Sequence, residues 1–196
     1  MDLQLSGRHV LVTGSHRGTG LLIAKRFIEE GSDVAVHGFD ETQASDAVAE
    51  LEGGYPVFGD ICRDEGTQIL VEQLKATPEI LVNNYGTAES GRWETLRSSD
   101  WIDLYQKNVL SAERLIQAFL PGMRTMNRAR IINLGTVGST RPNSRNPHYY
   151  AAKGALATMT VSLAKEVAGT NIRVNLVSPG MILTPEVREA YMRRGA

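Results

Sequence analysis

The stretch His9-Val10-Leu11-Val12-Thr13-Gly14-Ser15-His16-Arg17-Gly18-Thr19-Gly20 decides the fold that this chain is expected to adopt. From Val10 to Thr13 every residue is apolar or β-branched, as in a short buried strand, and glycines follow directly. Apolar residues then recur at helical spacing from Leu21 to Ile28, until Gly31 interrupts the pattern. The stretch therefore predicts a strand, a glycine turn and a helix.

The same alternation of strand and helix continues along the chain. We expect strands near residues 34–36, 56–58, 80–82, 130–134 and 172–177. We expect helices over about 41–52 and 64–75, a long helix that ends near Met126, and a helix from about Tyr149 to Ala168. Alternating strands and helices pair in parallel through right-handed crossovers, with helices on both faces of the sheet. The sequence therefore predicts a doubly wound α/β sheet in three layers, formed by one domain over residues 1–196.

Composition and charge narrow the possible partners. The formal net charge is −1 and charged residues make up 22% of the chain, so we expect no nucleic acid or anionic membrane as partner. Cys62 is the only cysteine, which rules out a disulfide within the chain and leaves no thiol cluster for a metal. No apolar run approaches the roughly 18 residues of a membrane span. These features indicate small-molecule partners, no metal and a cytoplasmic location.

The glycine turn suits a pyrophosphate. Gly14, Gly18 and Gly20 allow a tight turn and a close approach of the backbone to a phosphate group. The helix that follows offers free N–H groups and a partial positive charge at its N-terminus. Because ligands of such sheets bind beyond the carboxyl ends of the strands, this turn predicts a dinucleotide site.

A second pattern, Tyr149 followed four residues later by Lys153, indicates proton chemistry. Residues four apart lie on the same face of a helix, so the phenol and the ammonium would share one site. A cation beside a phenol lowers its pKa, and we expect Lys153 to do this to Tyr149. Tyr150 points about 100° away around the helix and is assigned to packing or to the pocket wall.

In its spacing and place, the glycine turn resembles that of the short-chain dehydrogenase/reductase family, whose cofactor is NAD(H) or NADP(H). Asn83-Asn84-Tyr85-Gly86 is similar to the Asn-Asn-Ala-Gly motif of the family, with tyrosine in place of alanine. Asp60 matches the family aspartate that contacts adenine, and Asn108 matches its helix asparagine. The segment Arg173-Val174-Asn175-Leu176-Val177-Ser178-Pro179-Gly180 resembles the one that closes over the nicotinamide. Among members, the chain resembles the 3-oxoacyl thioester reductases.

The resemblance implies a Rossmann-type fold and a set of site residues. It implies cofactor contacts from Gly14, His16, Arg17, Gly18, Thr19, Gly20, Asp60, Ile61, Asn83, Gly86, Tyr149, Lys153, Pro179, Gly180, Ile182 and Thr184. It implies catalytic roles for Tyr149, Lys153, Asn108 and Thr136. Thr136 stands where the family has a serine, and its hydroxyl can still donate to a substrate carbonyl; Ser139 is the less favoured substitute.

The choice between NAD(H) and NADP(H) depends on the residues after the second strand. An acidic side chain there would bind the ribose 2′-hydroxyl of NAD, but Gly38 and Phe39 occupy the place, and Asp40 comes slightly late. Arg17 and His16 in the glycine turn could instead meet a 2′-phosphate. NADP(H) is therefore favoured and NAD(H) stays open.

The function predicted from the sequence is hydride transfer between the nicotinamide and a carbonyl or secondary alcohol substrate. The alternative is a nucleotide-binding regulatory or scaffolding protein with the same fold and little turnover. Sixteen residues follow Gly180, where relatives usually continue through a helical cover and a last strand. We interpret 184–196 as the start of that cover, in a fragment or in a chain with a further tail. By resemblance we also expect a homodimer or homotetramer.

Overall fold

Parallel strands form one sheet in the computed structural model, which describes residues 2–184, 188–189 and 192. The strands in this part of the chain are β1 His9–Val12, β2 Asp33–Gly38, β3 Tyr55–Phe58, β4 Ile80–Asn83, β5 Ala129–Leu134 and β6 Ile172–Val177. Their order across the sheet is β3-β2-β1-β4-β5-β6, and every neighbouring pair is parallel. The doubly wound α/β fold predicted from the sequence is confirmed.

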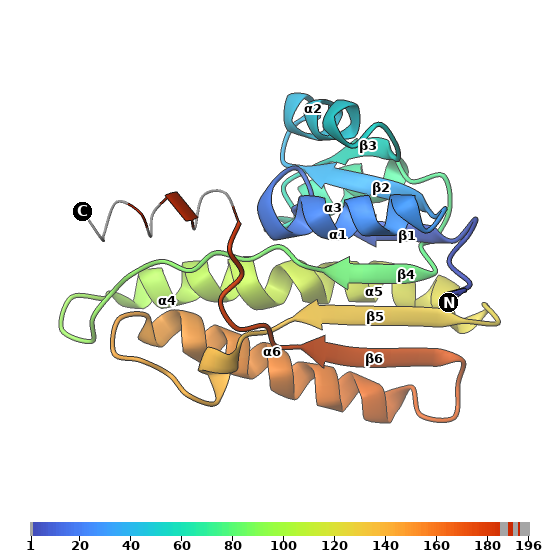
Figure 1. The fold of residues 1–196 in the computed structure, drawn as a ribbon. Helices are drawn as coiled ribbons and strands as arrows, with labels where there is room; N and C mark the ends of the chain where they lie inside the picture. The colour runs from blue at the N-terminus through green and yellow to red at the C-terminus, as the bar shows by residue number, and fades with distance from the viewer. Residues whose placement is uncertain (1, 185–187, 190–191, 193–196) are drawn as a thin grey trace.

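Helices cover both faces of this sheet. They are α1 Gly18–Glu29, α2 Glu41–Leu51, α3 Asp64–Glu72, α4 Ser98–Tyr105, α5 Ser111–Arg124 and α6 Pro147–Glu166. Figure 1 shows α1 and α2 on one side of the sheet and α5 and α6 on the other. No helix of the described residues is long and apolar enough to cross a membrane.

The alternation of side chains along the strands builds the two halves of the core. Val10 and Val12 of β1 pack in one cluster with Ala24 of α1. Leu11, which lies between them, packs in the other cluster with Leu115 of α5. Successive side chains of a strand point to opposite faces, so one short apolar run serves both helical layers.

Two elements differ from the boundaries expected from the sequence. The long helix before β5 is broken into α4, the π-helical turn η1 Gln106–Leu110, and α5. Helix α6 begins at Pro147, two residues before the expected start, because proline lacks an N–H and its fixed φ suits the first helical turn.

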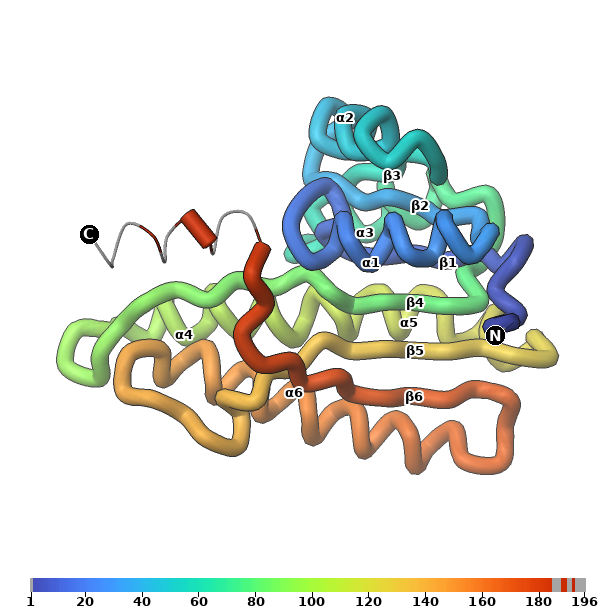
Figure 2. The backbone as a smooth tube through the Cα atoms, in the orientation of Figure 1, coloured from blue at the N-terminus to red at the C-terminus, as the bar shows by residue number. Residues whose placement is uncertain are grey.

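The segments that follow the strands gather at one end of the sheet. Figure 2 shows the chain after β6 running back past the ends of β5 and β4. The predicted covering segment, 184–196, lies mostly outside the described residues. The functional site is therefore built from the described segments after β1, β2, β4, β5 and β6.

Candidate active site

A cavity of about 1020 Å³ lies at the carboxyl ends of the strands. Strands β1 and β4 are parallel neighbours in the middle of the sheet. The chain goes from β1 to β2 on one side of this pair and from β4 to β5 on the other side. Sheets of this kind bind ligands in the crevice at such a reversal of strand order. The volume is at the upper end of small-molecule sites, which hold about 300–1000 Å³.

Many of the residues singled out from the sequence line this cavity. They are Gly14, His16, Arg17, Gly18, Thr19, Gly20, Gly86, Thr136, Tyr149, Pro179, Gly180, Ile182 and Thr184. The other predicted site residues, Asp60, Ile61, Asn83, Asn108 and Lys153, lie outside the lining. Lining residues not singled out as contacts are Phe39, Gln43, Asn84, Tyr85, Thr87, Ala88 and Gly135. Phe39, Asn84 and Gly135 follow a strand directly, and that position was the available signal.

Two glycines of the turn are required by its backbone. Gly14 has φ +61°, in the left-handed region that disfavours residues with a Cβ. A Cβ on Gly20 would meet the carbonyl oxygen of Gly14 and the side-chain amide of Asn84. That amide donates to the Thr13 carbonyl at 2.9 Å, which fixes the turn against β4. The start of α1 therefore faces the cavity.

His37 is hydrogen-bonded to the backbone of the glycine turn. It is fully buried, its Nδ1 accepts from the Gly14 amide at 2.9 Å, and its Nε2 lies 2.9 Å from the Gly59 carbonyl oxygen. An acceptor role at Nδ1 requires the proton on Nε2, so the ring is neutral in this arrangement. Burial lowers the pKa of His37 to about 4, which keeps the ring neutral at physiological pH.

Tyr149 and Thr136 meet at the other end of the cavity. Tyr149 lies in the first turn of α6, and Thr136 follows β5 and caps the 3-10 turn η2 Val137–Ser139. Burial raises the pKa of the Tyr149 phenol, and a hydrogen bond with the Thr136 hydroxyl partly opposes that rise. The phenol therefore stays protonated near neutral pH and is suited to give up a proton to a bound group.

Lys153 lies beneath this pair without lining the cavity. Only 4% of it is exposed, and its Nζ donates to the Leu134 carbonyl at 2.7 Å. Burial lowers the pKa of Lys153 to about 8. The expectation that Lys153 lowers the pKa of Tyr149 is not met in this arrangement, because burial raises that pKa and Lys153 is not among the influences on it.

Asn108 and Lys153 converge on Gly86. A Cβ on Gly86 would collide with Asn108 Oδ1 and would lie 3.0 Å from Lys153 Nζ. The Asn108 amide nitrogen donates to the carbonyls of Thr87 and Leu104, each at 3.0 Å, while its buried Oδ1 has no protein partner. Asn108 belongs to the π-helical turn η1, and such turns often occur at functional sites. Its orphan oxygen is a site for a bridging water.

Asn83 has a different position from the one implied by the family resemblance. It is 3% exposed, and its amide donates to Asn133 Oδ1 at 2.8 Å. Asn133 in turn donates to the Thr160 hydroxyl at 2.9 Å. This buried chain of hydrogen bonds joins β4, β5 and α6, so Asn83 orients the helix that carries Tyr149.

The carboxylate of Asp60 is also occupied. Its Oδ1 accepts from the Cys62 amide at 3.0 Å, and its Oδ2 lies 3.3 Å from Arg63 Nε.

Among the described lining residues, Arg17 is the one with a permanent charge, and no carboxylate lines the cavity. The cavity therefore favours an anionic ligand.

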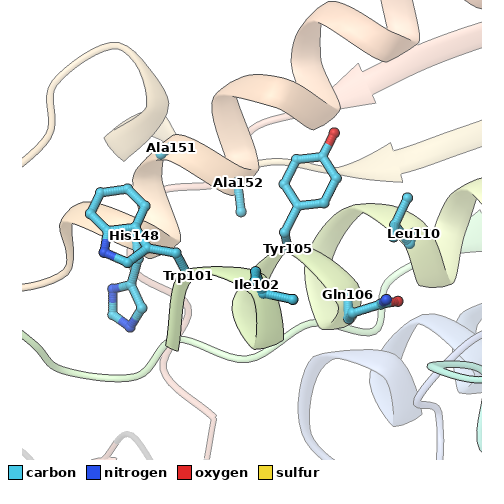
Figure 3. A pocket seen from close by; sticks show the side chains of 8 residues that line it. All are labelled: Trp101, Ile102, Tyr105, Gln106, Leu110, His148, Ala151 and Ala152. Atoms are coloured by element: carbon cyan, nitrogen blue, oxygen red, sulfur yellow. The ribbon is translucent and has the colours of Figure 1, made fainter. Parts of the chain in front are cut away.

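A second cavity, of about 350 Å³, lies among the helices. It is lined by Trp101, Ile102, Tyr105, Gln106, Leu110, His148, Ala151 and Ala152 (Figure 3). None of the predicted site residues lines it, and its walls are largely apolar. Adjacent positions of α6, His148 and Tyr149, line the two cavities.

The sheet is parallel, and a glycine turn follows its first strand. This turn opens on an anion-favouring cavity at the reversal of strand order. These features define a Rossmann-type dinucleotide-binding protein. The sequence pattern of the short chain dehydrogenase family matches residues 8–194, and the chain belongs to this family. As a member it is an NAD(P)-dependent dehydrogenase or reductase, which confirms the prediction of an enzyme.

Known proteins of this family resemble the chain over most of its length. It is 33% identical to the uncharacterized oxidoreductase YvrD of Bacillus subtilis, over 100% of this chain and 76% of that protein. It is 35% identical to the 3-oxoacyl-[acyl-carrier-protein] reductase FabG of Haemophilus influenzae, over 92% of this chain and 76% of that protein. The crystal structure of L-sorbose reductase from Gluconobacter frateurii, complexed with NADPH and L-sorbose, matches with a TM-score of 0.92 and 31% identity, over 100% of this chain and 78% of that chain.

Proposed function

We propose that the protein transfers a hydride between a nicotinamide dinucleotide and the carbon of a carbonyl or secondary alcohol substrate. The observation that carries the proposal is that Tyr149 and Thr136 line the same cavity, where the Thr136 hydroxyl acts to lower the pKa of the Tyr149 phenol. In the reducing direction, Thr136 donates a hydrogen bond to the carbonyl oxygen and Tyr149 delivers the proton to it. The cofactor, when bound, supplies the hydride.

Lys153 and Asn108 restore the proton that Tyr149 gives up. Lys153 has a pKa of about 8, so it can lose and regain a proton near neutral pH. The unpartnered Oδ1 of Asn108 and the Lys153 amine both face Gly86, where a water can bridge them. The proton then passes from solvent through this water and Lys153 to the phenolate.

NADP(H) is the cofactor we propose within this reaction. A pyrophosphate would lie against the turn from Gly14 to Gly20, and Arg17 and His16 are lining residues able to meet a 2′-phosphate. Asp40, the nearest acid after β2, caps α2 through the Gln43 amide at 2.8 Å and also accepts from the Gln43 side chain at 2.8 Å. Asp40 also lies outside the lining of the cavity, which speaks against a contact with a ribose hydroxyl.

Oxidation of NADPH and of NADH against a panel of carbonyl compounds tests this function. The panel contains 3-oxoacyl thioesters, ketoses and simple ketones, and turnover is followed by the absorbance of the reduced nicotinamide. We expect turnover of at least one class, with kcat/KM higher for NADPH than for NADH by about tenfold, the effect of one charge-assisted hydrogen bond. Binding of both nucleotides with no turnover on any class would favour the regulatory or scaffolding protein instead.

We also propose that the protein works as a homodimer or homotetramer in the cytoplasm. The helices beside β5 present large apolar side chains to solvent, with Ile102 63% exposed and Val161 56% exposed. The apolar cavity in Figure 3 lies on the same helices. The single cysteine fits a reducing compartment. Light scattering is expected to give the mass of two or four chains, and a monomer at micromolar concentration would contradict the assembly.

A further inference from the structure

We propose that Phe39 and Tyr85 form an aromatic wall on which the adenine ring of the dinucleotide stacks, and that Tyr85 closes the way to Asp60. The inference rests on the proposed function, since it concerns the cofactor of that reaction. It differs from the contact that the family resemblance implies, in which Asp60 meets the base.

The two rings are held together at the cavity. Phe39 follows β2 and Tyr85 follows β4, the strands on either side of β1 and its glycine turn. Their ring centroids lie 4.8 Å apart with the planes at 60°. Both rings line the cavity on one side and pack against the hydrophobic core on the other. The two rings are therefore already packed together in the structure.

Tyr85 reaches across to the loop after β3. Its hydroxyl lies 3.7 Å from the Cys62 sulfur, so the phenol spans the distance between the ends of β4 and β3. Asp60, Ile61 and Cys62 lie outside the lining of the cavity. Alanine, which the family motif has at this position, has no ring to span that distance. The tyrosine therefore lies between the cavity and the loop that carries Asp60.

The adenosine part of the cofactor would lie at this wall. With the nicotinamide near Tyr149 and the pyrophosphate at the glycine turn, the adenosine extends toward Phe39 and Gln43. The Gln43 side chain is already used, because its oxygen accepts from the Phe39 amide at 3.1 Å and its nitrogen donates to Asp40. Stacking is then the main contact left for the base, and one such contact on an aromatic ring is worth about 5-fold to 100-fold in affinity.

Dissociation constants for NADPH and for reduced nicotinamide mononucleotide, which lacks the adenosine, test the wall in the full chain. We expect Phe39→Leu, and separately Tyr85→Leu, to weaken NADPH binding by about tenfold. Neither variant should change the affinity for the mononucleotide by more than about twofold, because that ligand does not reach the wall. Phe27→Leu, a core change in α1 away from the cavity, is the matched control and should leave both constants unchanged.

Each other outcome has a defined meaning. Equal weakening of both ligands by Phe39→Leu and Tyr85→Leu would overturn the wall and indicate a general distortion of the site. NADPH affinity that resists these variants but falls about tenfold in Asp60→Asn would place the base at Asp60 and overturn the inference alone. If the unaltered protein binds neither NADPH nor NADH nor the mononucleotide, the proposed function is overturned, and the inference with it.

Discussion

Replacing Tyr149 by phenylalanine is expected to lower kcat by about 10²-fold to 10⁴-fold, the usual contribution of a positioned general acid. Phenylalanine keeps the ring that packs in the first turn of α6 and removes only the hydroxyl that meets Thr136. The affinity for the dinucleotide should change by less than about threefold, because the glycine turn lies on other elements. Steady-state kinetics with the substrate found in the panel, together with NADPH titration, measure both quantities.

The neighbouring tyrosine provides the matched control. Tyr150 lies outside the lining of the cavity, and its hydroxyl accepts a hydrogen bond from the Asn143 side chain at 2.7 Å. Tyr150→Phe should therefore keep kcat within about twofold of the unaltered enzyme. If Tyr149→Phe retained more than a tenth of the activity, Tyr149 would not be the proton donor, and the proposed mechanism would fail even though the family assignment stands.

The strands and the glycine turn could be predicted from the sequence because they depend on local spacing. Val10, Leu11 and Val12 form an apolar run of strand length, and the glycines that follow it set the turn. The parallel pairing then follows from the helix between each pair of strands. Tyr149 and Lys153 could be found in the same way, since they are four positions apart on one helix.

The surroundings of the site could not be read from spacing. Asn83 turns toward Asn133 because β4 and β5 pair in register at these two residues, and a sequence motif does not contain that register. The π-helical turn that carries Asn108 arises within a helix whose periodicity reads as ordinary α-helix. Tyr85 was visible as a departure from the family motif, but its contact with Cys62 depends on the loop after β3.

The pKa of Lys153 could also not be predicted from sequence spacing. Its place four positions after Tyr149 is local, but its pKa depends on its burial beside the end of β5. The sequence predicted a cation that acidifies the phenol. The structure instead holds a buried amine whose own pKa has fallen toward neutrality. This difference changes what a substitution at Lys153 should do to stability.

Lys153→Met is expected to abolish most of the activity without lowering stability. The unfolded chain holds the Lys153 proton up to its usual pKa of 10.5, whereas the folded protein releases it near pH 8. The unfolded state therefore binds more protons between about pH 8 and 10.5, so stability rises with pH across that window, and the cost of burying the cation is fully present below it. A methionine of similar length removes this cost.

The size of the effect is set by two opposing contributions. The lowered pKa corresponds to a penalty of up to about 3 kcal/mol at pH 7, and the lost hydrogen bond to the Leu134 carbonyl offsets about 1–2 kcal/mol of the gain. We expect the free energy of unfolding of Lys153→Met at pH 7 to equal or exceed that of the unaltered protein by up to about 2 kcal/mol. The difference should shrink as pH rises from 8 to 10.5, while kcat falls by about 10²-fold or more. Denaturant unfolding across this pH range measures the first effect, with Lys165→Met, an exposed position of the same helix, as control. If the variant is less stable at pH 7 by more than about 2 kcal/mol, the Lys153 ammonium stabilises the fold. The proposed proton relay would then be contradicted, because it requires an amine whose charged form is destabilised and easily loses its proton.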